Sequence, residues 1–356
     1  MPNFPLGVIE GFYGKMWTDE ARLKLFEFLA AESFNSFVYA PKAARKLRGG
    51  WAEPFTDTEL LALQEQSEAC SVLGICWGVG LSPLGAVAQF DHSAAKFLST
   101  KLEQINSLNP ALLCILFDDM HCEFANLAQR QLAIVEHIQQ HTTTPHLIVC
   151  PTYYSHDPVL EKVFGARPAS YWRDLGAGLS ADVDVFWTGN QVCSTSIMRD
   201  DLQVIAQQLQ RHPVIWDNYP VNDGEKASNF LNVRPFQQRD FRLPETARGH
   251  FSNPMNQCAL SKIALHSLPR LYAEKQHYDA ESALNSALAQ LQDARLASYL
   301  REDVPLFCDQ GLNCLDAGAR QRLLKRYAQF NVDCCAEITG WLNGDYTFDP
   351  ACLTES

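Results

Sequence analysis

The segment Ala111-Leu-Leu-Cys-Ile-Leu-Phe-Asp118-Asp119-Met-His121 joins an uninterrupted apolar run to two adjacent carboxylates. A strand buried on both faces of a parallel sheet has such a sequence, and its C-terminal end delivers polar groups to a pocket. Adjacent acids also occur in turns, at helix N-caps and in structural charge networks. The segment therefore indicates a buried parallel strand, and the rest of the chain must distinguish a catalytic pair from a structural one.

Short apolar runs of this kind alternate with longer amphipathic segments along the chain. This alternation is typical of repeated βα units rather than of a sandwich or a helical bundle. Eight such units in about 270 residues predict an α/β fold of the (β/α)8 barrel type. The expected strands are Phe4–Glu10, Phe34–Pro41, Gly74–Gly80, Leu112–Asp119, His146–Thr152, Asp184–Gly189, Val214–Asn218 and Gly249–Asn253.

Helical patterns separate most of these strands. Thr18 and Thr56 each precede acids in a first turn, as helix N-caps do, and a third pattern predicts a helix over Ile197–Leu209. After residue 273 the strand patterns stop and segments rich in Ala, Leu, Gln and Arg follow. We therefore expect a barrel at residues 1–273 and a small C-terminal helical appendage at residues 274–356.

Composition limits the functions that this chain can have. It has 356 residues, of which 47% are hydrophobic and 20% charged, as in an ordinary globular protein. The formal net charge of -12 argues against a nucleic-acid partner, because binding to phosphates needs clustered Lys and Arg. A neutral or polar ligand fits this composition better.

The sequence gives no signal for a membrane segment or a metal site. No apolar stretch approaches the length of a membrane span, and the first residues lack the order of a signal peptide. The 12 cysteines are scattered, and no Cys-x-x-Cys pair is matched by a second pair or by His at zinc spacing. We expect a cytoplasmic protein with no metal and no membrane partner.

Polar and aromatic residues follow the ends of the expected strands, and in a (β/α)8 barrel these ends meet at one mouth. Aromatic, amide and carboxylate groups there, without a Gly-rich phosphate-binding loop, suit a carbohydrate. The strand-end motifs are Glu10-Gly11-Phe12-Tyr13-Gly14, Tyr39-Ala40-Pro41-Lys42, Asp118-Asp119, Cys150-Pro-Thr-Tyr-Tyr154, Trp187-Thr-Gly-Asn190, Trp216-Asp-Asn218, Asn222-Asp223 and Ser252-Asn253-Pro254.

In this order, the motifs resemble those of glycoside hydrolase family 84, the O-GlcNAcase-type β-N-acetylglucosaminidases. The resemblance covers about residues 6 to 270. It implies a retaining hydrolase without a cofactor that removes terminal β-linked N-acetylglucosamine. In that family the 2-acetamido oxygen of the substrate attacks the anomeric carbon and gives an oxazoline, an exception to the usual two-carboxylate scheme.

The resemblance assigns different roles to the two adjacent acids. Asp118 accepts a hydrogen bond from the acetamide N–H, which orients the nucleophile and stabilises the positive charge that it develops. Asp119 protonates the departing oxygen and later deprotonates the attacking water. From the residues alone Glu10 competes with Asp119 as the acid, whereas family position makes Glu10 a supporting residue that could hold Lys42 or a backbone amide.

Further residues match substrate-binding positions of the family. Each has an ordinary alternative, such as a solvated loop charge, a turn former or core packing. Trp187 and Tyr13 could likewise stack on a sugar or pack in the core. The matched residues are Gly11 and Lys42 at sugar hydroxyls, Asp223 and Asn253 at the far hydroxyls of the pyranose, Tyr154 near the anomeric centre, Asn218 near the acetamide, and Cys150 and Trp216 in the acetyl pocket.

Three departures from the family pattern affect the rim of the expected pocket: the loop after Tyr154, Gly224 after Asp223, and the step Lys15-Met16. The expected partner is a conjugate of N-acetylglucosamine, and whether it is protein-linked or free stays open, as does the oligomeric state. A non-hydrolytic N-acetylhexosamine-binding protein and a transglycosylase on the same scaffold are the alternatives.

Overall fold

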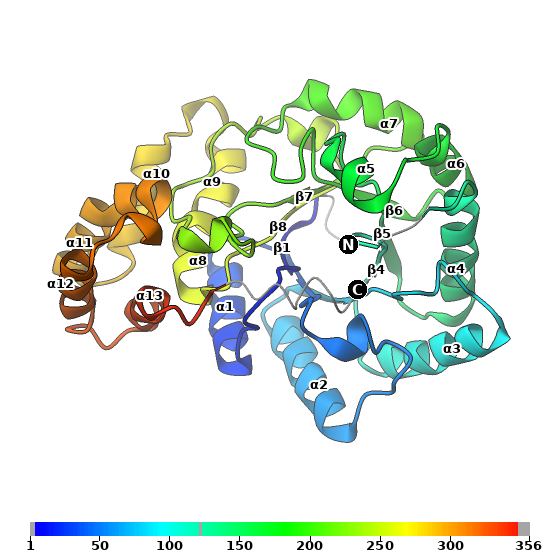
Figure 1. The fold of residues 1–356 in the computed structure, drawn as a ribbon, viewed down its shortest axis with the longest axis horizontal. Coiled ribbons are helices and arrows are strands. Elements are labelled where there is room, and N and C mark those ends of the chain that lie inside the picture. Colours follow the sequence, from blue (N-terminus) through cyan, green and yellow to red (C-terminus); the bar gives the residue numbers. More distant parts are fainter. Residues whose placement is uncertain (1–3, 121–122, 348–356) are drawn as a thin grey trace.

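The computed structural model describes residues 4–120 and 123–347, so His121 and both chain ends lie outside the described residues. Eight parallel strands close into a barrel in chain order, with β8 hydrogen-bonded to β1 (Figure 1). The predicted (β/α)8 barrel is therefore confirmed. Its strands are β1 (Leu6–Glu10), β2 (Ser36–Tyr39), β3 (Cys76–Leu81), β4 (Leu112–Leu116), β5 (His146–Cys150), β6 (Asp184–Trp187), β7 (Val214–Asp217) and β8 (Gly249–Ser252).

The acidic pair lies just beyond the end of β4. Leu116 and Cys150 form the last residue pair of the β4–β5 ladder, although the Phe117 N–H still donates to the Cys150 carbonyl at 2.9 Å. The strand expected to reach Asp119 thus ends three residues earlier, because the chain turns out of the sheet once the apolar run is over. This turn places both acids at the mouth of the barrel.

Helices surround the barrel (Figure 1). The Thr18 hydroxyl caps α1, and Thr56 forms a capping box with Glu59 at the start of α2, so both predicted N-caps are confirmed. The surrounding helices are α1 (Asp19–Ala31), α2 (Asp57–Val72), α3 (His92–Ser107), α4 (Leu127–His141), α5 (Val159–Phe164), α6 (Tyr171–Gly178), α7 (Gln203–Leu209), α8 (Cys258–Leu265) and α9 (Ser267–Glu274).

The helix expected over Ile197–Leu209 begins later than predicted. A 3-10 turn covers Arg199–Leu202, and only then does α7 begin. Ile197 instead forms a bridge with a distant segment, where its carbonyl accepts the Asp240 N–H at 3.1 Å. The Ile197 side chain is still buried. The apolar pattern therefore predicted correctly that Ile197 faces the core, but it placed the start of the helix too early.

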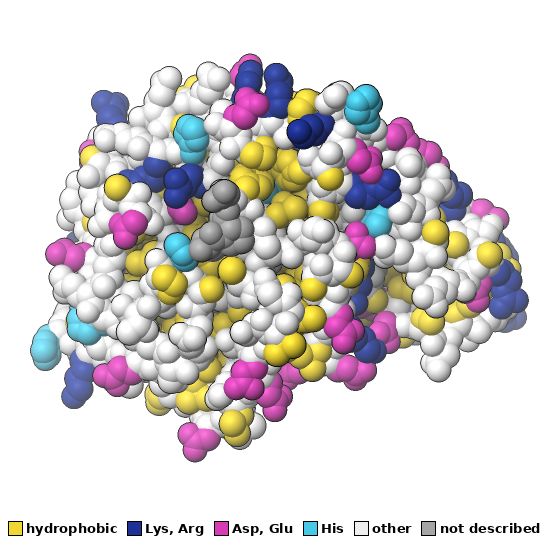
Figure 2. Space-filling model, turned by 180° about the vertical axis from the view of Figure 1, so that it is seen from behind, with side chains coloured by type: hydrophobic (Ala, Val, Ile, Leu, Met, Phe, Trp, Pro, Cys, Tyr) yellow, Lys and Arg dark blue, Asp and Glu magenta, His cyan; other side chains and the backbone are white. Residues whose placement is uncertain are grey.

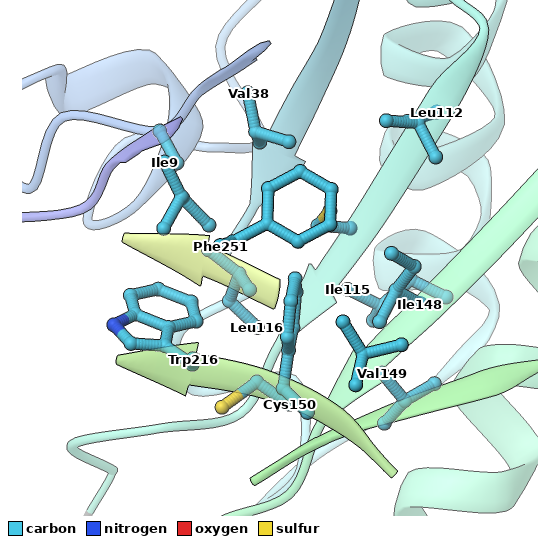
Figure 3. Close-up of a cluster of buried hydrophobic side chains, with 14 of the residues drawn as sticks. Ile9, Val38, Leu112, Ile115, Leu116, Ile148, Val149, Cys150, Trp216 and Phe251 are labelled. Atoms are coloured by element: carbon cyan, nitrogen blue, oxygen red, sulfur yellow. The ribbon is translucent and has the colours of Figure 1, made fainter. Parts of the chain in front are cut away.

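Apolar side chains from many strands fill the interior of the barrel. Figure 3 shows Ile9, Val38, Ile148 and Phe251 pointing toward one another, with Trp216 at one side of the cluster. This cluster leaves little free space inside the barrel, as is usual for this fold. The chemistry is therefore confined to the layer above it, at the C-terminal ends of the strands.

Four further helices lie beside the barrel (Figure 1): α10 (Ala280–Ala289), α11 (Ala294–Pro305), α12 (Ala317–Tyr327) and α13 (Asp333–Asn343). They form a second hydrophobic cluster that also includes Leu260 and Ile263 of α8. The predicted C-terminal helical region is thus present, and it shares its core with a helix of the barrel. Residues 348–356 of the expected appendage lie outside the described residues, and the division at residue 273 stays a prediction.

The surface carries both signs of charge. Figure 2 shows basic and acidic side chains interspersed over the reverse face, so the net charge of -12 is not gathered in one patch there. Within residues 4–120 and 123–347, no helix combines the length and the apolar character that a membrane crossing would require.

Candidate active site

A cavity of about 160 Å³ lies beyond the C-terminal ends of the strands and has room for one small ligand. The structure brings all ten sequence-predicted site residues into its lining: Gly11, Lys42, Asp118, Asp119, Cys150, Tyr154, Trp216, Asn218, Asp223 and Asn253. Five further residues complete the lining: Tyr13, for which sugar stacking was one of two alternatives, and Thr188, Val192, Cys193 and Val221, which were not proposed as ligand contacts.

Asp118 and Lys42 form a buried ion pair at this cavity. The Lys42 ammonium contacts Asp118 Oδ2, and both side chains are almost completely buried. The other carboxylate oxygen, Oδ1, is buried and accepts no hydrogen bond from a described residue. A buried acceptor without a partner is uncommon, and beside a cavity it is suited to a donor group of a ligand.

Asp119 has a left-handed backbone conformation, with φ of +55°. Its carboxylate accepts two phenolic hydrogen bonds, from Tyr13 to Oδ2 at 2.8 Å and from Tyr154 to Oδ1 at 3.0 Å. Burial, and next the Asp119 charge, raises the pKa of both phenols well above the ordinary value. Both hydroxyls therefore stay protonated and can keep donating to this carboxylate.

A chain of amides fixes the opposite side of the cavity. Asn218 Oδ1 accepts hydrogen bonds from Trp216 Nε1 and from Asn253 Nδ2, both at 2.9 Å. Asn253 Oδ1 in turn accepts the Gly11 N–H at 3.3 Å. A Cβ atom on residue 11 would lie 2.5 Å from the Trp216 ring, so the close approach of this backbone to the indole requires glycine.

Asp223 is joined to the loop that follows β1. Its Oδ2 accepts the Tyr13 N–H at 2.8 Å. Burial raises the pKa of Asp223 to about 6. The hydrogen bond from the Tyr13 N–H lowers this pKa but only partly offsets burial, and the negative charge of Asp119 raises it further. Asp223 is therefore mostly an anionic acceptor at neutral pH, and it begins to take up protons in mildly acidic solution.

Of the two partners considered for Glu10, Lys42 is wrong, whereas a backbone hydrogen bond from Trp17 agrees with the backbone-amide alternative. The Glu10 carboxylate pairs with Arg22 of α1, with N–O distances of 2.8 and 2.9 Å, and not with Lys42. Glu10 is fully buried and does not line the cavity. Burial raises the pKa of Glu10 despite the opposing effect of Arg22. This geometry leaves Glu10 as a link between β1 and α1.

The two aromatic residues left undecided differ in their environments. Trp187 is fully buried against Trp172 and His156, which confirms the packing alternative. Tyr13 instead connects Asp119 and Asp223, a role that was not foreseen although Tyr13 stands in a strand-end motif. Cys193, which lies in the loop after β6, belongs to no strand-end motif and gave no sequence signal.

The described residues contain no group of three or more His, Cys, Asp or Glu side chains that could hold a metal ion. The cavity lining supplies three carboxylates, a buried ammonium group, two phenols and two amides. Such a set can orient a polar ligand and move protons to and from it.

Comparisons with known proteins identify the family to which the chain is similar. A family model described as beta-N-acetylglucosaminidase matches residues 6–306. The Protein O-GlcNAcase of Rattus norvegicus and that of Mus musculus are each 30% identical over 279 residues, which is 76% of this chain but only 30% of either relative. A mutant of the O-GlcNAc hydrolase of Thermobaculum terrenum is similar in structure, with a TM-score of 0.78 and 28% identity, over 97% of this chain and 82% of that chain. The chain thus spans less than a third of the length of the two mammalian proteins.

Proposed function

The chain belongs to the beta-N-acetylglucosaminidase family, and from this premise we propose that it hydrolyses terminal β-linked N-acetylglucosamine with retention of configuration. The conjugate that carries the sugar can be protein-linked or free. We place the reaction in the cytoplasm, which is supported by buried free thiols such as Cys114 and Cys150, a state typical of a reducing compartment.

In the first step, the acetamide oxygen of the substrate attacks the anomeric carbon as the bond to the leaving oxygen breaks. Asp119 gives its proton to that oxygen, and the acetamide closes onto the anomeric carbon as an oxazoline in its N-protonated (oxazolinium) form, which keeps the N–H proton. In the second step, Asp119 takes a proton from water while that water attacks the anomeric carbon and opens the oxazoline. Two inversions at one carbon give overall retention.

Asp118 is proposed to accept the acetamide N–H during both steps. The observation that carries this assignment is its Oδ1 atom, which is buried and accepts no hydrogen bond from any residue that the structure describes, although Oδ2 pairs with Lys42. The acetamide nitrogen becomes partly positive as its oxygen attacks, so a fixed carboxylate stabilises the transition state more than the bound substrate.

The other lining residues are proposed to hold the sugar ring. Asp223 and Asn253 would bind its far hydroxyls, and Gly11 and Lys42 would contact nearer ones. Asn218 would lie by the acetamide and Tyr154 by the anomeric centre, with the acetyl methyl against Cys150 and Trp216. These assignments are supported by the common cavity and by the amide chain that fixes Asn218 and Asn253.

An aryl β-N-acetylglucosaminide and its deacetylated glucosaminide analogue test this proposal together. Only the acetylated sugar can form an oxazoline, so turnover should be confined to it, and Asp118→Ala should reduce that turnover by about a hundredfold or more. Equal turnover of both sugars would reject the mechanism. Tight binding of N-acetylglucosamine without turnover would indicate a binding protein, and sugar transfer to an added acceptor would indicate a transglycosylase.

A further inference from the structure

The loop that carries Asp223 extends from the barrel to the C-terminal helices. We define the Asp223 loop as residues 222–234. Its Leu231 N–H donates to the Phe307 carbonyl at 2.9 Å, and Arg234 forms an ion pair with Asp309, with Nη2 and Oδ2 2.7 Å apart. Phe307 and Asp309 both belong to the helical turn that follows α11, so the loop is bonded to a segment outside the barrel.

Helix α13 holds the same loop at a second point. Trp341 Nε1–H donates to the Ser228 carbonyl at 3.0 Å, and Trp341 is only 1% exposed. Its ring also packs edge to face against Phe307 at 5.8 Å, which connects the two points of attachment. A Cβ atom on Gly311 would lie 2.8 Å from the Asn229 carbonyl oxygen, so the helical region and the loop are in close contact there as well.

The held part of the loop is connected directly to the cavity. Asn222 Nδ2 donates to the Phe230 carbonyl at 2.9 Å, which closes the loop at its base beside Asp223. Asp223 in turn accepts the Tyr13 N–H, and the Tyr13 hydroxyl donates to Asp119, each at 2.8 Å. A shift of the outer part of the loop would therefore move Asp223 relative to Tyr13 and to the sugar.

We propose that the C-terminal helices position Asp223 for sugar binding, with Trp341 as the main positioning residue. This inference rests on the proposed function, in which Asp223 binds hydroxyls of the sugar. Trp341 does not line the cavity, so it acts only through the Ser228 end of the loop. A carboxylate on a loop binds a hydroxyl well only if its geometry is fixed within about 0.5 Å, and contacts outside the barrel provide that constraint.

The test compares Trp341→Phe with the wild-type protein. The variant keeps a ring in the core but loses the N–H donor to Ser228. We expect KM for an aryl N-acetylglucosaminide, and the Kd of free N-acetylglucosamine in calorimetry, to rise about threefold to tenfold, while kcat changes less than about twofold. Asp309→Asn breaks an exposed ion pair whose loss should cost little stability, and it should raise KM and Kd by about twofold.

Two control variants lie in the same helical region. Tyr327→Phe removes a buried hydroxyl that donates to Asp303 Oδ2 at 2.7 Å, and Leu300→Ala leaves a cavity in the same hydrophobic cluster. Neither residue contacts the Asp223 loop through a hydrogen bond. Both variants should lower thermal stability with little change in KM, because they leave the hydrogen bonds that hold the loop at Ser228 and Leu231 in place although Leu231 and Val233 belong to the same cluster.

The decisive measurement is a double-mutant cycle. In an Asp223→Asn background, Trp341→Phe should change KM and Kd by less than about twofold, because the positioned group is already lost. Full additivity, or equal effects of Trp341→Phe and the two controls, would overturn the inference while leaving the activity in place. A wild-type protein that binds the sugar without hydrolysing it would reject the proposed hydrolysis, and the Kd values would still test the positioning role.

Discussion

Asp119 has an unusual backbone conformation, and each of its two carboxylate oxygens accepts a hydrogen bond. Few residues other than glycine adopt positive φ, and aspartate is among the exceptions because its short side chain can bond locally. Here Tyr13 and Tyr154 hold its two oxygens, and an Arg48 N–H approaches its carbonyl at 3.4 Å. Such a conformation costs of order 1–3 kcal/mol and persists only where the surroundings fix it, as they do at this residue.

Replacing this one residue tests the proposed proton transfer. Asp119→Asn should slow the hydrolysis of substrates with poor leaving groups by about a hundredfold to ten-thousandfold. Activated aryl leaving groups need little protonation, so their first step should be far less affected. The measurement is kcat/KM for a series of aryl N-acetylglucosaminides of graded leaving-group acidity. Equal losses along the series would contradict the assignment, and Tyr327→Phe serves as a variant remote from the cavity.

At the scale of elements, β7 and β8 are joined by a buried charge network that does not line the cavity. Asp217, at the end of β7, accepts two hydrogen bonds from Arg239, at 2.7 and 2.8 Å, and His250 Nε2 of β8 lies 3.1 Å from it. Burial by itself raises the pKa of Asp217, but Arg239 and His250 outweigh it and lower the value to about 2. This network connects the two strands that Asn218 and Asn253 directly follow.

Removing the Asp217 charge should therefore destabilise this part of the sheet. Asp217→Asn leaves Arg239 as an uncompensated buried charge and should cost about 3–5 kcal/mol at pH 7. Because the folded-state pKa lies below the ordinary 3.8, the stabilisation is complete above about pH 4 and is lost as the pH falls through about 2. Thermal unfolding should show that Asp217→Asn is much less stable than the wild-type protein at pH 7, and that this difference in stability becomes smaller near pH 2. The control Asp200→Asn, which replaces an exposed acid, should lose almost no stability at either pH. A loss of stability in Asp217→Asn that is the same at both pH values would contradict this account.

At the scale of the whole molecule, two hydrophobic clusters meet at α8. Leu260 and Ile263 of this helix belong to the cluster of the C-terminal helices, whereas Cys258 and Leu265 of the same helix belong to the barrel cluster. One helix thus contributes a face to each core. The two parts of the chain are energetically coupled, whatever the position of the boundary between them.

A shortened chain tests this coupling. Ending the chain at residue 279 would expose Leu260 and Ile263 to water, at a cost of about 1.5–3 kcal/mol for each side chain. We expect the shortened chain to aggregate or to lose cooperative unfolding, as judged by size-exclusion chromatography and circular dichroism. A soluble, folded and active product would instead establish the division at residue 273 as a true domain boundary.

The sequence alone determined the eight strands, their order and the place of Asp118 and Asp119 at a strand end. These features are local, because a buried strand needs a continuous apolar run and the direction of parallel strands fixes which ends form the mouth. The ordered motifs, through their family resemblance, also identified ten residues that the fold gathers around one cavity. Their individual roles remain predictions.

Only the tertiary structure decided the contacts between distant parts of the chain. Tyr13 meets Asp223 across 210 positions of sequence, Arg22 rather than Lys42 pairs with Glu10, and Ile197 leaves its expected helix. The attachment of the Asp223 loop to Trp341 spans 113 positions. Local patterns state which side chains are buried, but they carry no information on which distant donor and acceptor meet, because that depends on how the packed elements are placed in space.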